Sequence, residues 1–385
     1  MIKFSKERMM SVVTIVASLF ILILLVLLPT GYEDAVIYQG ADRTIGEIIS
    51  TDNSMLVSTG LIQTGEQRCR VKLLGGKFKG EIVTAVNMLN GSLEQDKIFG
   101  SGDRAQVLIS YEGDAIYSIS MIDHYRLDKE LILAGIFVVL LVLFAGTSGI
   151  RAVLSFAITI LMIWKVLVPS CLKGFNPVLL GLMICLVLTV VIAVLVYGVH
   201  EKALAASLGS LLGIGMTALL GILFTGMYNI HGAVMPYSES LLYSGFSHLN
   251  LTSIFMASIF IGSSGAVMDL AVDITSSVWE VVEHKPEITW KEAARSGINV
   301  GRAAIGTQTT TLLLAYSGGY ISLLMVFMAQ GTPIYNILNY KYIASEILET
   351  LIGSIGLVTV APFTALVCGL LFTRGIKKVH SSLSL

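Results

Sequence analysis

Charged residues are scarce in this chain: Asp, Glu, Lys and Arg make up 13% of its 385 residues, while 55% are hydrophobic. A soluble protein covers its exterior with polar and charged side chains, so this balance excludes an ordinary soluble domain. A net charge of −1 gives no reason to expect a nucleic-acid partner. The four cysteines, Cys69, Cys171, Cys185 and Cys368, lack the spacing of metal ligands, and we expect no metal and no other cofactor.

The chain contains several long runs of apolar residues. A membrane-spanning helix needs about 20 mainly apolar residues. Runs of about this length are Ser11–Pro29, Leu131–Gly146, Ala152–Leu172, Pro177–Val199, Ala203–Met227, Leu251–Val272, Ala303–Met328 and Tyr342–Phe372. The first is interpreted as a signal anchor, because Lys3, Lys6 and Arg8 precede it and no small-residue cleavage site follows it. The sequence therefore predicts a polytopic α-helical membrane protein with about eight transmembrane helices.

The positions of Lys and Arg orient these helices, because cytoplasmic loops are enriched in both residues. With the N-terminus inside, the cytoplasmic side receives Arg151, Lys202, Lys285, Lys291, Arg295, Arg302, Arg374, Lys377 and Lys378. The short outer loops receive Lys173 and Lys341. We therefore predict a multi-pass protein of the bacterial cytoplasmic membrane, surrounded by lipid, with both termini in the cytoplasm.

The polar segment 31–127 carries the signals of short β-strands. Stretches rich in Val, Ile and Leu, separated by Gly, Asn and Asp, occur at Ser54–Leu61, Gln67–Leu74, Glu81–Leu89, Ala105–Ser110 and Ala115–Ile122. This pattern favours a small extracytoplasmic β-barrel that resembles an OB-fold. The predicted domains are an anchor helix (1–30), this β-rich domain (31–127), a seven-helix membrane domain (128–378) and a cytoplasmic tail (379–385).

Acidic residues in and just after the run Leu251–Val272 mark a candidate site. An ionisable residue within a span costs about 2.5–3.5 kcal/mol on insertion scales, so each one needs a reason. One helix face is formed by residues at steps of three or four: Ser258, Gly262, Gly265, Asp269 and Asp273. The face carries small residues at one end, where a neighbouring helix can approach closely, and acidic residues at the other. Both acids also lie near the cytoplasmic end of the run, where they could instead meet water.

A second polar face, formed by Asn299, Arg302, Gly306 and Thr310, begins the seventh run. Arg302 and Asp269 lie at similar depths on consecutive antiparallel helices. We therefore expect an ion pair between them inside the bundle, which protonation of the Asp would break. Two alternatives are an Arg302 side chain that extends to lipid headgroups, and threonine hydroxyls that bond only to their own helix.

The last run carries two further acids, Glu346 and Glu349, in its outer part. Lys165 lies at a similar depth in the third run. Lys165 can pair with one of these carboxylates, or all three side chains can extend to the outer membrane interface. These residues are secondary candidates for a site.

The whole chain resembles the YibE/F family of bacterial membrane proteins in its anchor, outer domain and membrane bundle. Four stretches carry the resemblance: Gly75–Glu81 (GGKFKGE), Gly265–Asp269 (GAVMD), Ser296–Arg302 (SGINVGR) and Gly353–Gly356 (GSIG). The resemblance implies the membrane fold but no settled biochemical role.

From about residue 177 onward the chain is also similar to the membrane half of SecF, in the RND superfamily. The matching features are the acids Asp269 and Asp273, the stretch Arg302–Leu312 (RAAIGTQTTTL), Gly318-Gly319 and Ala361-Pro362. This similarity implies an ion-driven cycle in which an Asp within the membrane exchanges protons against a nearby Arg. The chain differs from the SecF pattern in having more spans, a smaller outer domain and an acid displaced by a few positions.

These features together predict an ion- or proton-coupled membrane permease, or an export-assisting membrane protein. Asp269 would titrate, Arg302 would be its counter-charge, and Asp273, Asn299 and Thr310 would line the path of protons or monovalent ions. The alternative is a non-transporting scaffold or sensor whose outer domain binds a protein partner. We expect no enzyme: all six histidines map to loops or tails, so the Gly-x-Ser-x stretch that begins at Gly262 has no general base within the membrane.

The predicted orientation is testable by thiol labelling. Cys69, in the polar segment, should react with an impermeant thiol reagent added from outside, after unfolding if the barrel buries it. A cysteine placed at Ser276 should not react from that side. Reversed accessibility of the two positions would contradict the orientation.

Overall fold

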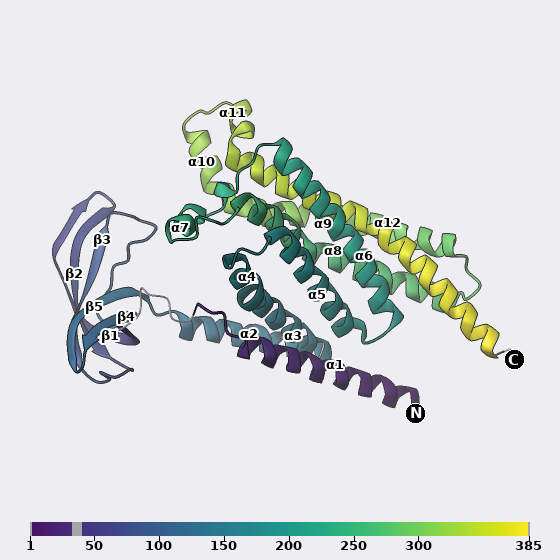
Figure 1. The fold of residues 1–385 in the computed structure, drawn as a ribbon, viewed down its shortest axis with the longest axis horizontal. Helices are drawn as coiled ribbons and strands as arrows, with labels where there is room; N and C mark the ends of the chain where they lie inside the picture. The colour runs from purple at the N-terminus through teal and green to yellow at the C-terminus, as the bar shows by residue number, and fades with distance from the viewer. Residues whose placement is uncertain (1, 33–40, 384–385) are drawn as a thin grey trace. The chain divides into compact units, whose positions relative to one another are not determined.

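The computed structural model describes residues 2–32 and 41–383, with side chains described for 12–32 and 41–374. Residues 33–40 of the predicted outer domain and 384–385 of the predicted tail lie outside this part of the chain. The chain divides into two compact units, one of residues 1–30 and 145–385 and the other of residues 31–144. Figure 1 traces the elements of both units, each of which is described by itself below.

The unit of residues 31–144 contains a closed β-barrel. Its strands are β1 (Ala41–Thr59), β2 (Ile62–Leu73), β3 (Ile82–Asn90), β4 (Arg104–Glu112) and β5 (Ala115–His124), paired in the order β1-β2-β3-β5-β4. Antiparallel pairing of β4 with β1 closes the barrel. The predicted small barrel is confirmed, and a barrel of five strands is the architecture of OB-folds. Helix α2 (Leu127–Ala145) follows β5.

The first strand is where the prediction for the barrel was wrong. The sequence predicted a strand at Ser54–Leu61, whereas β1 already begins at Ala41. Gly46, Asp52 and Asn53 are typical of turns, but Gly46 pairs regularly with Leu73, and a register shift between Asp52 and Met55 shows a β-bulge at the other two residues. Because a bulge bends a strand without ending it, one long strand can pair with both β2 and β4.

The barrel interior is mainly apolar, but it contains two buried amides that bond to each other, Gln67 on β2 and Asn87 on β3. Cys69, Val71 and Leu73 alternate along β2 and are fully buried. Burial raises the pKa of the Cys69 thiol to about 11, so its labelling requires unfolding. The Gln67 amide group donates to the Asn53 side chain at 2.8 Å and to the carbonyl of Phe99 at 3.0 Å. It also accepts from the Phe99 N–H at 3.0 Å and the Asn87 side chain at 3.1 Å.

The second unit is helical. Its helices are α1 (Ile2–Leu27), α3 (Thr147–Leu161), η2 (Met162–Leu167), α4 (Val168–Leu172), α5 (Pro177–Tyr197), α6 (Glu201–Met227), η3 (Gly232–Val234), α7 (Ser238–Tyr243), α8 (Leu251–His284), α9 (Trp290–Ser317), η4 (Gly318–Tyr320), α10 (Ile321–Ala329), α11 (Ile334–Asn339) and α12 (Lys341–Leu383). Six helical segments among the described residues are long and apolar enough to cross a membrane: Thr147–Leu172, Pro177–Tyr197, Glu201–Met227, Leu251–His284, Trp290–Ala329 and Lys341–Arg374.

The two other predicted spans form helices with weaker membrane signals. The described apolar part of α1 is Val12–Leu27, which is shorter than a full span. Helix α2 begins with Asp128, Lys129 and Glu130, and none of its residues is buried. The chain is thus a polytopic helical protein as predicted, with six clear spans in the described residues and two further apolar helices.

Small residues allow the central helices to lie close together. Helix α12 packs against α6, α8 and α9, as Figure 1 shows. A methyl group added at Gly213 of α6 would lie 2.8 Å from Val360 Cβ of α12, closer than real Cβ contacts. A methyl group at Gly297 of α9 would lie 2.8 Å from Ala365 Cβ of the same helix. Lipid tails are as apolar as the helices themselves, so such close contacts must supply much of the packing energy.

The hydrogen bonds of the buried Gln67 amide should contribute to the stability of the barrel. In a fragment of residues 41–126, Gln67→Leu should lower the free energy of unfolding by roughly 2–4 kcal/mol, because it leaves the Phe99 N–H and one of the two N–H groups of the Asn87 side chain unpaired. Gln95→Leu, at an exposed position, is the matched control and should change it by less than about 0.5 kcal/mol. Urea titrations followed by circular dichroism measure both. A random-coil spectrum of the unsubstituted fragment would contradict an independently folding barrel.

Candidate functional site

The predicted polar face of α8 exists, and most of it is exposed in a single copy of the chain. Gly262, Gly265, Asp269 and Asp273 are all exposed, while Ser258 is half-buried. The opposite side of α8 carries the buried residues of the core, such as Val267, Ile274 and Val278. The acids therefore do not face the centre of the helical unit.

Two contacts fix the relative depth of α8 and α9. A methyl group at Gly297 would lie 2.7 Å from Val278 Cγ2, and one at Gly301 would lie 3.3 Å from Ile274 Cδ1. Moving from Gly297 to Gly301 along α9 therefore corresponds to moving from Val278 back to Ile274 along α8, so the two helices run antiparallel. By the same count, Arg302 lies level with Asp273, and Asp269 lies one helical turn away, level with Gly306.

The expected ion pair between Asp269 and Arg302 does not form within one chain. Among the described residues, no ion pair or hydrogen bond joins the two side chains, and both are exposed. The spacing predicted similar depths for the two residues, but it did not predict the rotation of each helix about its axis, which turns both side chains away from the core. Their role in ion coupling stays a prediction.

The threonines of α9 bond back to their own helix, the alternative noted above. The Thr310 hydroxyl donates to the carbonyl of Gly306 at 3.0 Å, and the Thr311 hydroxyl donates to that of Thr307 at the same distance. Thr310 and Asn299 are both exposed. The Thr310 hydroxyl oxygen can still accept a hydrogen bond, but its proton already has a partner.

The secondary candidates on α12 lie in a different setting, at the end of the helical unit where α8 begins. The hydroxyl oxygen of Ser258 lies 3.4 Å from the carboxylate oxygen Oε1 of Glu349. Glu346 has one carboxylate oxygen that is buried without a hydrogen-bond partner in the described part of the chain. Both carboxylates are half-buried. We name Ser258, Tyr316, Glu346 and Glu349 the carboxylate cluster.

Tyr316 of α9 is the member of this cluster that the sequence analysis missed. A methyl group at Gly262 would lie 2.5 Å from its hydroxyl oxygen, so the phenol rests on the small end of the α8 face. Helical side chains lean toward the N-terminus, which brings the hydroxyl of Tyr316 down to the level of Gly262. That oxygen is buried and has no hydrogen-bond partner among the described residues. The sequence signal that could have pointed to this contact is Gly262, which lies one helical turn from Ser258 and leaves room for a side chain from a neighbouring helix.

Lys165 does not join the cluster. It lies in η2, a π-helical turn that interrupts the helix between α3 and α4, and no ion pair in the described residues links it to Glu346 or Glu349. π-Helical turns are rare and frequently occur at functional sites. No feature of the sequence predicted this turn.

The carboxylate cluster has the chemistry to hold a proton or a monovalent cation. Carboxylate, hydroxyl and phenol oxygens are hard ligands that suit such ions, and a carboxylate can also carry the proton itself. No group of three or more His, Cys, Asp or Glu side chains that could hold a metal ion occurs in the described residues.

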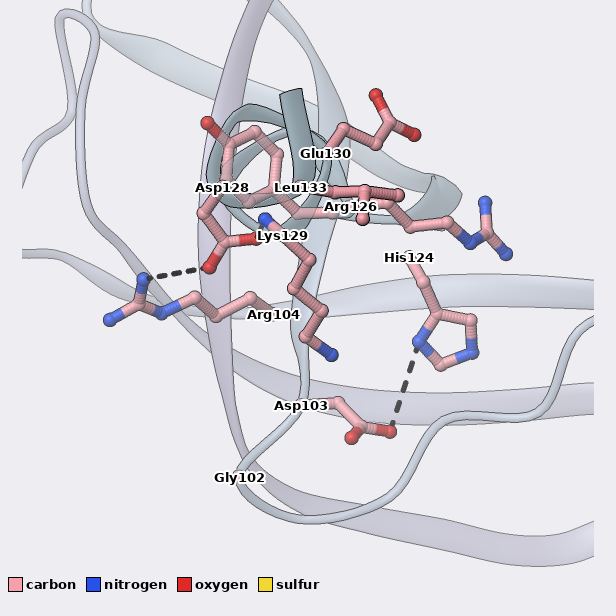
Figure 2. Close-up of a pocket in the computed structure, with 10 residues that line it drawn as sticks. Gly102, Asp103, Arg104, His124, Arg126, Asp128, Lys129, Glu130 and Leu133 are labelled. Carbon is pink, nitrogen blue, oxygen red and sulfur yellow. Dashed lines mark hydrogen bonds and ion pairs between the residues drawn. The ribbon is translucent and has the colours of Figure 1, made fainter. Parts of the chain in front are cut away.

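The barrel unit has a site of its own, a pocket of about 620 Å³ between the end of β5 and the first turns of α2 (Figure 2). Its ionisable lining residues are Asp103, Arg104, His124, Arg126, Asp128, Lys129 and Glu130. Arg104 lies 3.7 Å from Asp128, and His124 Nδ1 lies 3.9 Å from Asp103, the two contacts drawn in Figure 2. Beside the pocket, a hydrogen bond from Arg126 lowers the pKa of the Asp123 carboxyl. The balanced charges suit a small polar or zwitterionic ligand.

The fold and these sites define the class: a multi-pass helical membrane protein with a separate β-barrel unit. A family profile described as YibE/F-like protein matches residues 133–374, more than half of the chain. The protein therefore belongs to the YibE/F family. No curated protein and no solved structure matched the chain. None of these comparisons supports the similarity to SecF and the RND superfamily, which stays a prediction.

The unpaired hydroxyl of Tyr316 predicts that its removal stabilises the protein. Tyr316→Phe should raise the free energy of unfolding by about 1 kcal/mol, because a buried hydroxyl without a partner costs about 1–3 kcal/mol. Thermal unfolding of the full-length protein in detergent measures the change. Tyr228→Phe, at an exposed tyrosine, is the matched control and should leave the midpoint unchanged. A lower midpoint for Tyr316→Phe would show that the hydroxyl does have a stabilising partner.

Proposed function

We propose that the protein is an ion- or proton-coupled permease, or an export-assisting membrane protein driven by the same coupling, in the bacterial cytoplasmic membrane. The observation that carries the proposal is the placement of Glu349 against Ser258 of α8, with the unpaired hydroxyl of Tyr316, from α9, against Gly262 on the next turn of α8. A carboxylate within a span is costly, and such residues commonly mark proton or ion pathways.

The polar face of α8 supports a route between two acidic positions. Ser258 meets the carboxylate cluster at one end, and Asp269 lies about 16 Å further along the helix, at 1.5 Å per residue. Gly262, which the Tyr316 hydroxyl contacts, and Gly265 lie between them, and Gly265 leaves space on that face because a methyl group there would meet nothing within 4 Å. A proton or monovalent ion could pass from one acidic position to the other along this face.

Protonation supplies a physical reason for coupling. A protonated carboxyl is neutral and is far easier to cover with apolar side chains than a carboxylate is. Loading Glu349 with a proton would therefore favour tighter packing of α8, α9 and α12 around the cluster, and release would favour looser packing. A substrate that binds one packing better than the other would then be coupled to the ion.

The pocket of the barrel unit favours a second candidate function, a sensor or scaffold. A concave site with convergent charged groups is the usual form of a binding site for a small molecule or a short peptide. In that case the helical unit would anchor the barrel and transmit ligand binding rather than move ions.

Ion flux decides between the two functions. In liposomes that contain the full-length protein, an imposed pH gradient followed with an internal dye should decay faster than in protein-free vesicles. Glu349→Gln should return the decay to the protein-free rate, because glutamine cannot exchange a proton. Glu239→Gln, at an exposed position on α7, is the matched control and should keep the wild-type rate.

The flux experiment has a clear contrary result. Equal decay with and without protein, tested with Na⁺ and with K⁺ present, would argue against ion coupling and favour the sensor. Equal decay for the wild-type protein and Glu349→Gln would remove the carboxylate cluster from the pathway.

A further inference from the structure

Helix α9 is poorly covered in a single copy of the chain. Five of its 28 residues are buried, Ala293, Ala294, Gly297, Gly301 and Leu312, compared with 15 of the 34 residues of α8. Its contacts lie on one side, where Gly297 and Gly301 meet α12 and α8. The remaining surface of α9 is open over most of its length.

The open surface is polar and small rather than uniformly apolar. Asn299, Arg302, Gly306 and Thr310 are all exposed on α9. A methyl group at Gly306 would meet nothing within 4 Å, so another helix could approach closely there. Lipid tails offer no hydrogen-bond partners, so polar and small residues on a span usually face another helix instead.

The neighbouring open surface, on α8, carries the opposite charge. Asp269 and Asp273 are exposed and have no ion-pair partner among the described residues. Arg302 lies at the depth of Asp273, as the contact of Gly301 with Ile274 shows. Two copies of the chain in the same orientation would therefore present an arginine and an aspartate to each other at one depth.

We propose that a second, parallel copy of this chain covers the exposed faces of α8 and α9, with Arg302 of each copy against Asp273 of the partner subunit. In a two-fold interface each contact occurs twice, so one Arg–Asp pair per chain satisfies both copies. Lipid headgroups are the other possible occupant, and the test below separates them.

The dimer would also complete the polar face of α8. Asp269 and Gly265 open to the surroundings in one copy, and a partner helix would enclose them. The inference does not depend on ion coupling, because exposed polar faces need cover in a sensor as much as in a permease.

Cross-linking in lipid bilayers tests the interface. Full-length protein with Thr310→Cys should form a covalent dimer with a short bis-maleimide reagent, and the yield should persist when lipid is added in large excess. Leu351→Cys, at an equally exposed position on α12, is the matched control and should stay monomeric, as should the protein with its native cysteines alone. Equal yields at both positions, or dimers lost on dilution, would overturn the proposal.

A charge exchange tests the pairing itself. Arg302→Asp and Asp273→Arg should each lower the Thr310→Cys cross-linking yield severalfold, because like charges then meet across the interface. The double variant should restore it, because both pairs are re-formed with the charges reversed. If the single variants keep the full yield, or if the double variant stays as low as either single one, Arg302 does not meet Asp273 of a partner and lipid headgroups cover it instead. A dimer without ion flux would leave this inference standing while rejecting the proposed function.

Discussion

Close approach of helices through small residues is the constraint on which the helical unit depends. Gly213, Gly297 and Gly353 each lie where an added methyl group would come within 3 Å of a neighbouring helix. In a bilayer the hydrophobic effect does not hold one apolar helix against another, so close contact and interhelical hydrogen bonds must do so. Replacing such a glycine would push α12 away from its neighbours, and every polar group placed by α12 would move with it.

This packing separates the ionisable residues into two environments. Glu346 and Glu349 project from α12 at the end where α8 and α9 also contribute a hydroxyl, and they are half-buried. Asp269 and Asp273 project from the side of α8 that the core does not use. The same helix contacts that bury the first pair expose the second, because each helix has only one side for the core. The proposed route and the proposed dimer both follow from this division.

The barrel unit follows different physics, because its core is formed by alternating strand residues and two hydrogen-bonded buried amides, Gln67 and Asn87. Gln67 uses both of its donors and both lone pairs within the barrel, and so ties the segment around Phe99 to β2. The pocket lies beside that segment, with the ring of His124 4.5 Å from that of Phe99 and tilted by 45° to it. Disturbing Gln67 should therefore affect the pocket as well as the fold.

The sequence by itself determined the class of protein, since apolar runs as long as a bilayer is thick and a polar segment with period-two alternation allow few other folds. It also determined which residues share the face of α8, because helical spacing alone sets that. Only the tertiary structure decided which way the face points, that Arg302 lies level with Asp273 rather than Asp269, and that Tyr316 joins Glu349. Helix rotation, register and a distant partner are set by side-chain packing between segments far apart in the chain, and no local pattern encodes them.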